Sequence, residues 1–242
     1  MSAPQAGAAR QRTEILISGF GGQGVVRMGQ IIGLYAIHQG QRVTILKSHG
    51  TETRGGYVRS QIVISPDYVD SPVVENADIF VAFSEPAYRK FFELAGGLIL
   101  FDPDLVTKVN AAGAERHVPV PSTALSKEHF SNPLFANMIM LGALTRTAQM
   151  DLAAMRKTML EVIPRFHDDN SRALELGYNL ECAVNAVGTA HAALPAIGAA
   201  HAALPATGLP GTALPGTALP ATGLPATALP TARQGGHAQG KR

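Results

Sequence analysis

One stretch near the start of the chain, residues 14–27, limits the folds that this sequence can adopt. It opens with a short apolar run, residues 15–17, of the kind that forms a buried parallel strand. The segment GFGGQG, residues 19–24, follows, and apolar residues then recur at helical spacing. A strand, a glycine turn and a helix start in this order indicate a doubly wound α/β sheet whose turn favours an anion such as phosphate.

The sequence that follows continues this alternation. We expect strands at 42–46, 57–65, 77–83, 98–101 and 116–120, a helix that ends near residue 95 at the pair Gly96-Gly97, and helices at 132–149, 151–164 and 169–186. Asp151 is expected to cap the second of these last three helices. The pattern predicts a single three-layer, doubly wound α/β domain with a helical C-terminal part.

The two ends of the chain differ from this domain in composition. Residues 1–13 are small and polar and are predicted to be disordered, and the α/β domain is assigned to residues 14–187. Residues 188–242 repeat short units built on Leu-Pro with Ala, Gly and Thr. Recurring proline excludes a helix, and the absence of aromatic side chains denies this region a core. We predict a low-complexity, disordered Pro/Ala-rich tail.

Charge is distributed unevenly along the 242 residues, whose formal net charge is +2. All 18 acidic residues lie at or before Glu181 and three of the 20 Lys and Arg lie after it, so residues 1–181 carry 17 basic and 18 acidic side chains. This is not the clustered positive charge of a nucleic-acid-binding face. No apolar run reaches the about 18 residues of a membrane span, and residues 1–13 lack the apolar core of a signal peptide. We expect a cytoplasmic protein that binds neither nucleic acid nor membrane.

Two loops supply the candidate binding residues. The second loop is HGTETRGG, residues 49–56, in which Arg54 offers a strong cation beside glycines that let a partner approach closely. Both loops are expected at the carboxyl ends of strands and therefore at one edge of the sheet. Lys47 stands where a nicotinamide-binding fold would hold the ribose with an acidic residue. The predicted cofactor-binding residues are Gly19, Gly21, Gly22, Gln23, Gly24, Lys47, Glu52, Arg54, Gly55 and Gly56.

Purely structural roles for the same residues are also consistent with the sequence. The glycines of the first loop can serve only a tight strand–helix join, and Arg54 can pair on the surface with Glu52. No catalytic or metal-binding arrangement is predicted, and the one thiol cannot hold an iron–sulfur cluster, which usually takes four. The residues considered and set aside are Ser18, Ser48, Ser84, Cys182, His38, His117, His129, His167, Asp168 and Asp169.

Together the two loops resemble the gamma subunit of 2-oxoacid:ferredoxin (acceptor) oxidoreductases. The resemblance runs from about residue 14 to residue 179 and leaves out the tail. It is carried by GFGGQG (19–24) and GTETRGG (50–56), with support from Ser65, Ser71-Pro72, Ala77-Asp78, Gly96-Gly97, Asn137 and residues 141–143.

The resemblance implies a role that the residues alone do not show. In that family a 2-oxoacid is decarboxylated on thiamine diphosphate, electrons pass to iron–sulfur clusters, and the acyl group leaves on coenzyme A. The resemblance implies a subunit that is not catalytic alone. Thiamine diphosphate and the iron–sulfur clusters would be held by alpha, beta and ferredoxin-like (delta) subunits. Ferredoxin or another protein would accept the electrons. The glycine loop, Lys47 and Arg54 would contribute to the coenzyme A site.

The identity of the 2-oxoacid is less constrained. The form HGTETRGG is similar to members that act on 2-oxoglutarate and branched-chain 2-oxoacids, and aromatic 2-oxoacids remain open. One alternative to the subunit is a free-standing nucleotide or acyl-carrier binding module with an interaction tail. Another is a self-sufficient nicotinamide oxidoreductase, against which Lys47 argues.

Overall fold

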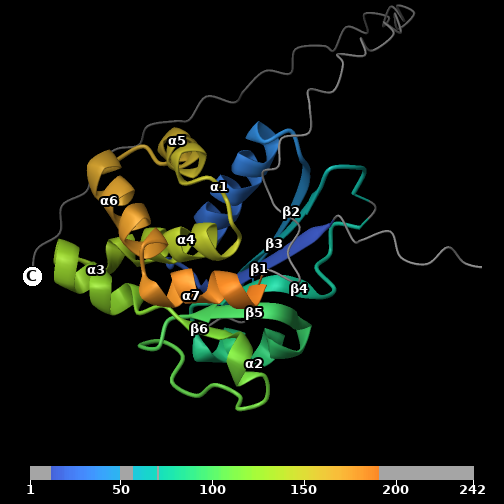
Figure 1. The fold of residues 1–242 in the computed structure, drawn as a ribbon, viewed down its shortest axis with the longest axis horizontal. Helices are drawn as coiled ribbons and strands as arrows, with labels where there is room; N and C mark the ends of the chain where they lie inside the picture. Colours follow the sequence, from blue (N-terminus) through green and yellow to red (C-terminus); the bar gives the residue numbers. More distant parts are fainter. Residues whose placement is uncertain (1–11, 50–56, 70, 191–242) are drawn as a thin grey trace, which may run out of the picture. The chain divides into compact units, whose positions relative to one another are not determined.

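A computed structural model describes residues 12–49, 57–69 and 71–190 of the chain (Figure 1). The chain divides into two units, Met1–Ala203 and Leu204–Arg242, and every described residue belongs to the first. Most of the predicted disordered N-terminus and of the predicted tail therefore lies outside the described residues.

A mixed sheet of six strands forms the middle of the described unit (Figure 1). In spatial order the strands are β2 (Arg42–His49), β3 (Tyr57–Ser65), β1 (Thr13–Phe20), β4 (Ala77–Ala82), β5 (Ala95–Phe101) and β6 (His117–Pro119). From β1 to β6 the neighbours are parallel, whereas β3 is antiparallel to both β1 and β2. The connection 50–56 is shorter than the about twelve residues that a parallel crossover needs, so β2 returns directly into a neighbouring antiparallel strand.

Helices cover both faces of this sheet (Figure 1). They are α1 (Val25–His38), α2 (Glu85–Phe91), α3 (Ser122–Phe130), α4 (Ala136–Thr147), α5 (Leu152–Val162), α6 (His167–Tyr178) and α7 (Glu181–Ala190), with 3-10 turns η1 (Phe92–Leu94), η2 (Ala114–Arg116) and η3 (Pro133–Phe135). The larger core joins the sheet to α1 and α4–α7, and the smaller core joins its other face to α2. The predicted three-layer α/β fold with a helical C-terminal part is confirmed.

The alternation of β1 shows how the sequence builds these layers. Ile15 and Ile17 belong to the larger core and Leu16 to the smaller one, and all three side chains are fully buried. Burying each of them stabilises the fold by about 1.5–3 kcal/mol. This burial on both faces fixes β1 in the middle of the sheet, with the glycine turn at its carboxyl end.

The predicted cap of α5 at Asp151 is confirmed, and α2 has a similar cap at Ser84. The Oδ1 atom of Asp151 accepts a hydrogen bond from the backbone N–H of Ala154 (2.7 Å), and Ser84 Oγ accepts one from Ala87 (3.3 Å) at the start of α2. Each cap satisfies a backbone donor that the first turn of a helix leaves unpaired.

The pair Gly96-Gly97 does not end a helix, contrary to prediction. The helical segment ends at Leu94, and both glycines lie inside β5. A Cβ at Gly97 would stand 2.0 Å from the carbonyl oxygen of Asp78, and a Cβ at Gly96 would meet the side chain of Asn76. The glycines therefore let β5 approach β4 closely at an irregularity in their register.

The C-terminal helices also differ from the prediction. Residues 169–186 form two helices, because α6 ends at Tyr178 and α7 begins at Glu181. The break redirects the chain so that Ala183 and Ala186 reach the larger core. Helix α7 continues to Ala190, past the predicted domain boundary at residue 187. Helix α3 was not expected, because its two buried residues, Ser122 and Ser126, are polar and it lacks a continuous apolar stripe.

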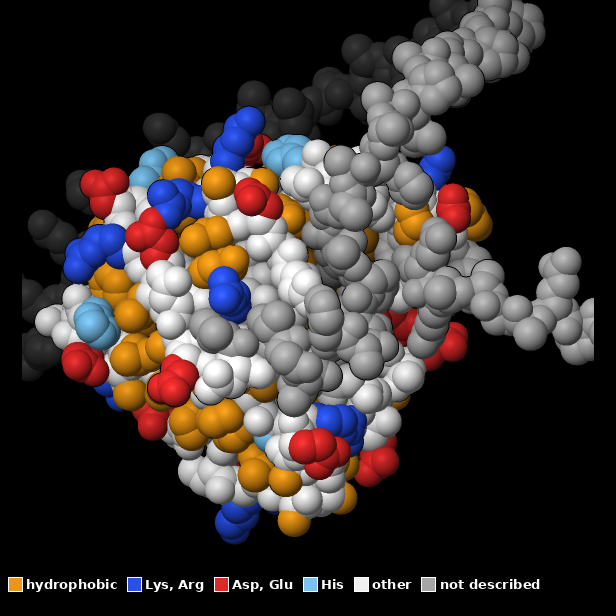
Figure 2. Space-filling view, in the orientation of Figure 1, with side chains coloured by type: hydrophobic (Ala, Val, Ile, Leu, Met, Phe, Trp, Pro, Cys, Tyr) orange, Lys and Arg blue, Asp and Glu red, His pale blue; other side chains and the backbone are white. Residues whose placement is uncertain are grey.

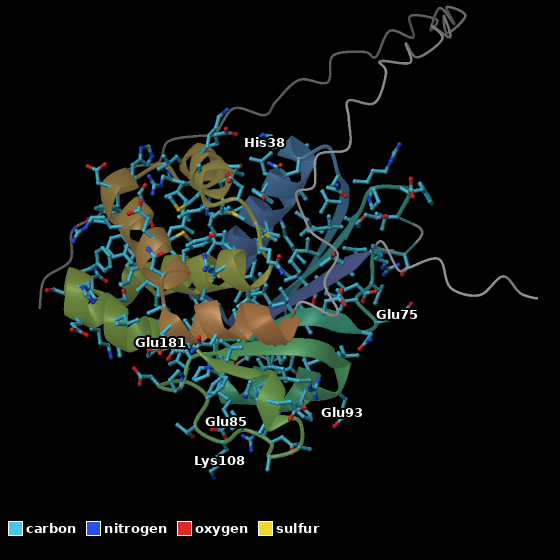
Figure 3. All side chains as sticks on the ribbon, viewed as in Figure 1. His38, Glu75, Glu85, Glu93, Lys108 and Glu181 are labelled. Carbon is cyan, nitrogen blue, oxygen red and sulfur yellow. The ribbon has the colours of Figure 1, made fainter. Side chains whose placement is uncertain are left out.

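Charged side chains of both signs are intermingled on the face shown in Figure 2, between small apolar patches. Labelled charged residues lie at the periphery, for example Glu93 and Lys108 (Figure 3). None of the helices in the described segments combines the length and apolar character that crossing a bilayer would require.

Candidate functional site

The glycine turn joins β1 to α1 at the carboxyl edge of the sheet. Gly22 and Gly24 have positive φ angles, 89° and 80°, which glycine adopts at little cost. Gly24 precedes the first residue of α1, and no side chain caps that helix end. The first backbone N–H groups of α1 therefore face outward at the positive end of the helix dipole, an arrangement that favours an anion.

The side chain of Gln23 stabilises the glycine turn by two hydrogen bonds to the backbone. Its Oε1 atom accepts a hydrogen bond from the backbone N–H of Phe20 (2.5 Å), and its Nε2 atom donates to the carbonyl oxygen of Phe83 (2.9 Å), just beyond β4. Both functional atoms of the amide are thus engaged within the protein. Gln23, predicted to bind a cofactor, holds the turn against the end of β4.

The glycines of the turn have different surroundings. A Cβ at Gly19 would lie 2.5 Å from Gln23 Oε1, and a Cβ at Gly24 would lie 2.1 Å from Asn137 Nδ2. A Cβ at Gly21 or Gly22 would meet nothing within 4 Å, and both residues are exposed. Gly19 and Gly24 are therefore required by internal packing, whereas Gly21 and Gly22 form a bare ridge that a ligand can approach.

A hollow of about 360 Å³ lies beside this ridge, on the side of β3. We call it the first hollow; it is lined by Phe20, Gly21, Gly22, Gly24, Val25, Val26, Arg27, Gln30 and Val58. Its volume falls within the about 300–1,000 Å³ usual for small-molecule sites. It brings three of the predicted glycines, Gly21, Gly22 and Gly24, together with the polar side chains of Arg27 and Gln30 of α1.

Arg27 is a candidate that the sequence analysis missed. Its guanidinium is exposed and donates from Nη1 to the carbonyl oxygen of Val162 (3.1 Å) at the end of α5, which fixes it beside the first hollow. A guanidinium carries five N–H donors, so this bond leaves donors for an anion. The available signal was helical periodicity, since Val25, Met28 and Ile32 are buried and Arg27 falls on the opposite face.

Lys47 lies on the same face of the sheet as α1. It pairs with Ser60 in the β2–β3 ladder, and Ser60 Oγ donates to the carbonyl oxygen of Val25 (3.2 Å) at the start of α1. The Lys47 side chain is exposed. The backbone of Lys47 therefore lies on the face of the sheet that carries the start of α1.

The remaining predicted residues, Glu52, Arg54, Gly55 and Gly56, lie outside the described residues. The strands that flank them are described: His49 pairs with Val58, and Tyr57 pairs with Phe20. The connection 50–56 therefore leaves and re-enters the sheet at the edge that carries the glycine turn, which is the edge predicted.

The residues set aside as catalytic or metal-binding candidates serve structural roles where contacts are seen. His117 donates from Nδ1 to the Gly113 carbonyl (3.0 Å) and its Nε2 lies 2.8 Å from the Tyr88 hydroxyl.

Cys182 packs at the margin of the larger core, and burial raises the pKa of its thiol, which makes it a weaker nucleophile at neutral pH. Asp168 and Asp169 lie in the first turn of α6. Within the described residues no group of three or more His, Cys, Asp or Glu could hold a metal ion.

Comparison with known proteins agrees with this architecture. The sequence model of the pyruvate ferredoxin/flavodoxin oxidoreductase family matches residues 14–180, almost the whole described region. The chain belongs to this family. The 2-oxoglutarate synthase subunit KorC of Methanocaldococcus jannaschii is 36% identical over 177 residues, which cover 71% of this chain and 95% of that subunit.

Two solved structures share the fold. The gamma subunit of a keto/oxoacid ferredoxin oxidoreductase from Geobacter sulfurreducens has a TM-score of 0.61 and 30% identity, and the match covers 72% of this chain and 98% of that one. The 2-oxoglutarate:ferredoxin oxidoreductase of Magnetococcus marinus, solved with 2-oxoglutarate, coenzyme A and succinyl-CoA bound, has a TM-score of 0.60 and 21% identity over 78% of this chain and 32% of that chain. The predicted identity, a gamma subunit of a 2-oxoacid:ferredoxin oxidoreductase, is confirmed.

Proposed function

We propose that this gamma subunit binds the phosphate groups of coenzyme A within a multi-subunit 2-oxoacid oxidoreductase. The observation that carries the proposal is the first hollow, where the bare ridge at Gly21 and Gly22, the uncapped start of α1 and the Arg27 guanidinium meet. The Magnetococcus marinus enzyme, which shares the fold, was solved with coenzyme A bound, and this supports the proposal.

The residues present fit such a ligand. Phosphate oxygens accept hydrogen bonds, and the first hollow offers backbone N–H groups together with a guanidinium that can bind two oxygens at once. Lys47 adds a positive charge on the same face. From the sequence motif we also assign Glu52, Arg54, Gly55 and Gly56 to coenzyme A binding. This subunit would hold and orient the acyl acceptor, while the bond-breaking steps take place in other subunits.

The test measures coenzyme A kinetics of the assembled complex at saturating 2-oxoacid. Arg27→Gln and Lys47→Gln are each expected to raise the KM for coenzyme A by about 10- to 100-fold, because a hydrogen bond to a charged group contributes about 1.5–3 kcal/mol. The KM for the 2-oxoacid should stay unchanged.

Lys108→Gln is the matched control, because it removes the same charge from an exposed position in the α2 layer (Figure 3). It is expected to leave the KM for coenzyme A as it is. An Arg27→Gln, Lys47→Gln double variant that assembles normally and keeps the KM of the parent complex would disprove the phosphate site.

We assign the rest of the reaction to partner subunits of alpha, beta and ferredoxin-like (delta) type in the cytoplasm. The chain has one cysteine, too few thiolates for an iron–sulfur cluster. Thiamine diphosphate and the clusters are therefore placed in those partners, with ferredoxin or another protein as acceptor. Among 2-oxoacids we favour 2-oxoglutarate, because KorC, over 95% of its length, is 36% identical to this chain.

Purification of the chain from its native host should recover a brown complex that contains iron and thiamine diphosphate. Metal analysis and cofactor extraction of the purified sample measure this. Isolation of a colourless, stable monomer without partner subunits would contradict the assignment and favour a free-standing binding module.

A further inference from the structure

A second hollow, of about 420 Å³, lies on the other side of the glycine turn, toward β4. It is lined by Gly22, Gln23, Phe83, Leu105, Thr123, Asn132, Pro133, Leu134, Ala136 and Asn137. Of the residues of the glycine turn, only Gly22 and Gln23 line this second hollow, and Lys47 does not.

The position of the second hollow follows from the topology. Strand β1 leads into α1 on one face of the sheet, and β4 leads into α2 on the opposite face. Successive crossovers to opposite faces open a crevice between the carboxyl ends of two neighbouring parallel strands, where open α/β sheets bind their ligands. The segment before α4 and the first residues of α4 complete the lining of this crevice.

The lining of the second hollow differs in chemistry from that of the first. Its residues carry no charge, and Phe83, Leu105, Pro133 and Leu134 give it an apolar wall. Asn137 brings an amide against the turn at Gly24. Within the described part of the chain this amide makes no hydrogen bond, so it can donate to and accept from a ligand. Such a site suits an uncharged chain that contains amide groups.

The two hollows share Gly22, and the ridge between them is bare, since a Cβ at Gly21 or Gly22 would meet no atom within 4 Å. We infer that one ligand crosses this ridge, with the pantetheine arm of coenzyme A in the second hollow and its phosphates in the first. This inference rests on the proposed function and adds the path of the uncharged arm.

The experiment fills the second hollow without changing charge. In the assembled complex, Ala136→Trp is expected to raise the KM for coenzyme A by about 10- to 100-fold and to abolish inhibition by free pantetheine. Inhibition by 3′-phospho-ADP, which lacks the arm, should stay within about twofold of the parent value. Ala154→Trp, another half-buried helical alanine outside both hollows, should change none of these values.

A milder pair of variants covers the case in which Ala136→Trp does not fold. Leu134→Ser removes an apolar side chain from the mouth of the hollow, and Ile37→Ser removes one of the same exposure (56% and 55%) from the far end of α1. Only Leu134→Ser should weaken pantetheine inhibition, by about three- to tenfold.

The outcomes separate the two proposals. Unchanged pantetheine inhibition in both Ala136→Trp and Leu134→Ser, with a raised KM for coenzyme A in Arg27→Gln, overturns the path through the second hollow and leaves the phosphate site standing. Failure of Leu134→Ser to assemble, with the isolated chain folded, also overturns it and assigns the hollow to a partner subunit.

Discussion

Replacement of Gly24 by Ala is expected to lower the free energy of unfolding by about 2–4 kcal/mol. Two effects add at this position. A φ of 80° costs an L-residue about 1–2 kcal/mol, and the new methyl group would lie 2.1 Å from Asn137 Nδ2. Rotation of the Asn137 amide relieves only part of that overlap, because the Cβ of Asn137 would still lie 3.0 Å from the new methyl group, so we expect the first turn of α1 to shift as well. We therefore also expect the KM for coenzyme A to rise at least about tenfold.

Gly21→Ala is the matched control for the stability measurement. Its φ is not positive and its Cβ would meet nothing, so denaturant unfolding of the full-length chain should show a change of no more than about 1 kcal/mol, in the stabilising direction. Equal stability of the Gly24→Ala and Gly21→Ala variants would show that the turn is not held as the structure describes.

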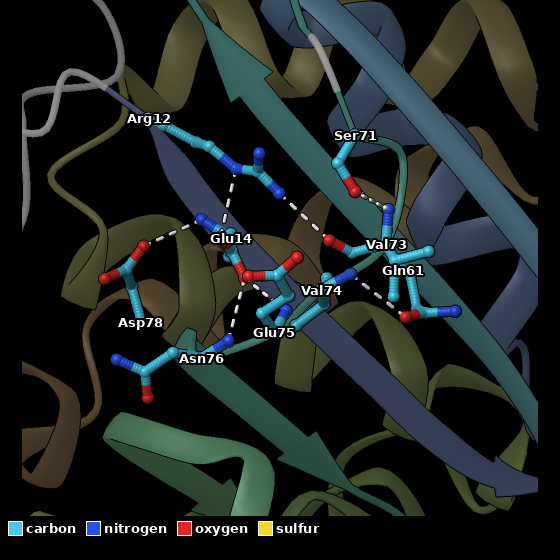
Figure 4. Close-up of polar contacts among 9 residues, drawn as sticks. All are labelled: Arg12, Glu14, Gln61, Ser71, Val73, Val74, Glu75, Asn76 and Asp78. Carbon is cyan, nitrogen blue, oxygen red and sulfur yellow. Dashed lines mark hydrogen bonds and ion pairs between the residues drawn. The ribbon is translucent and has the colours of Figure 1, made fainter.

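Glu14→Ala should destabilise the opposite, amino edge of the sheet by about 3–5 kcal/mol. The Glu14 side chain is fully buried at the start of β1 (Figure 4). Its Oε2 atom accepts from the backbone N–H groups of Glu75 (2.7 Å) and Asn76 (3.0 Å), and its Oε1 atom lies 3.0 Å from Arg12 Nε. Truncation leaves two part-buried backbone donors and a guanidinium without this carboxylate.

Glu14→Gln tests the same site more gently, because it keeps one acceptor oxygen and loses the charge. Its loss of stability in thermal or denaturant unfolding should be smaller than that of Glu14→Ala. Glu75→Ala serves as the control, since Glu75 is exposed on the segment that Glu14 holds. If Glu14→Ala unfolded at the same denaturant concentration as Glu75→Ala, the carboxylate would not be the anchor of this segment.

Local sequence patterns were enough to predict the strand–turn–helix unit and most strands. The bounds of the third strand, 57–65, are those of β3, and Val58, Ile62 and Ile64 fall on one face of it. The glycine turn could be located because several glycines in one short segment between a strand and a helix have few other uses. These features depend on residues close together in the chain.

The errors arise where a distant segment determines the structure. Gly96 and Gly97 look like a helix stop, and only the position of Asp78 in the neighbouring strand shows that they permit close approach. The periodicity of residues 169–186 is continuous through the break between α6 and α7, because the turn is set by packing on the larger core. Arg27 was missed because its place depends on the end of α5, and the second hollow depends on three separate segments.

The antiparallel return from β2 to β3 has a consequence for how this scaffold can diversify. Both strands are anchored in the sheet by the pairing of their described residues, β2 against β3 and β3 against β1 as well. A connection between strands that are paired in this way can change in length and composition while the strands keep their register. Loops at the edge of a sheet commonly vary in this way without a change of fold.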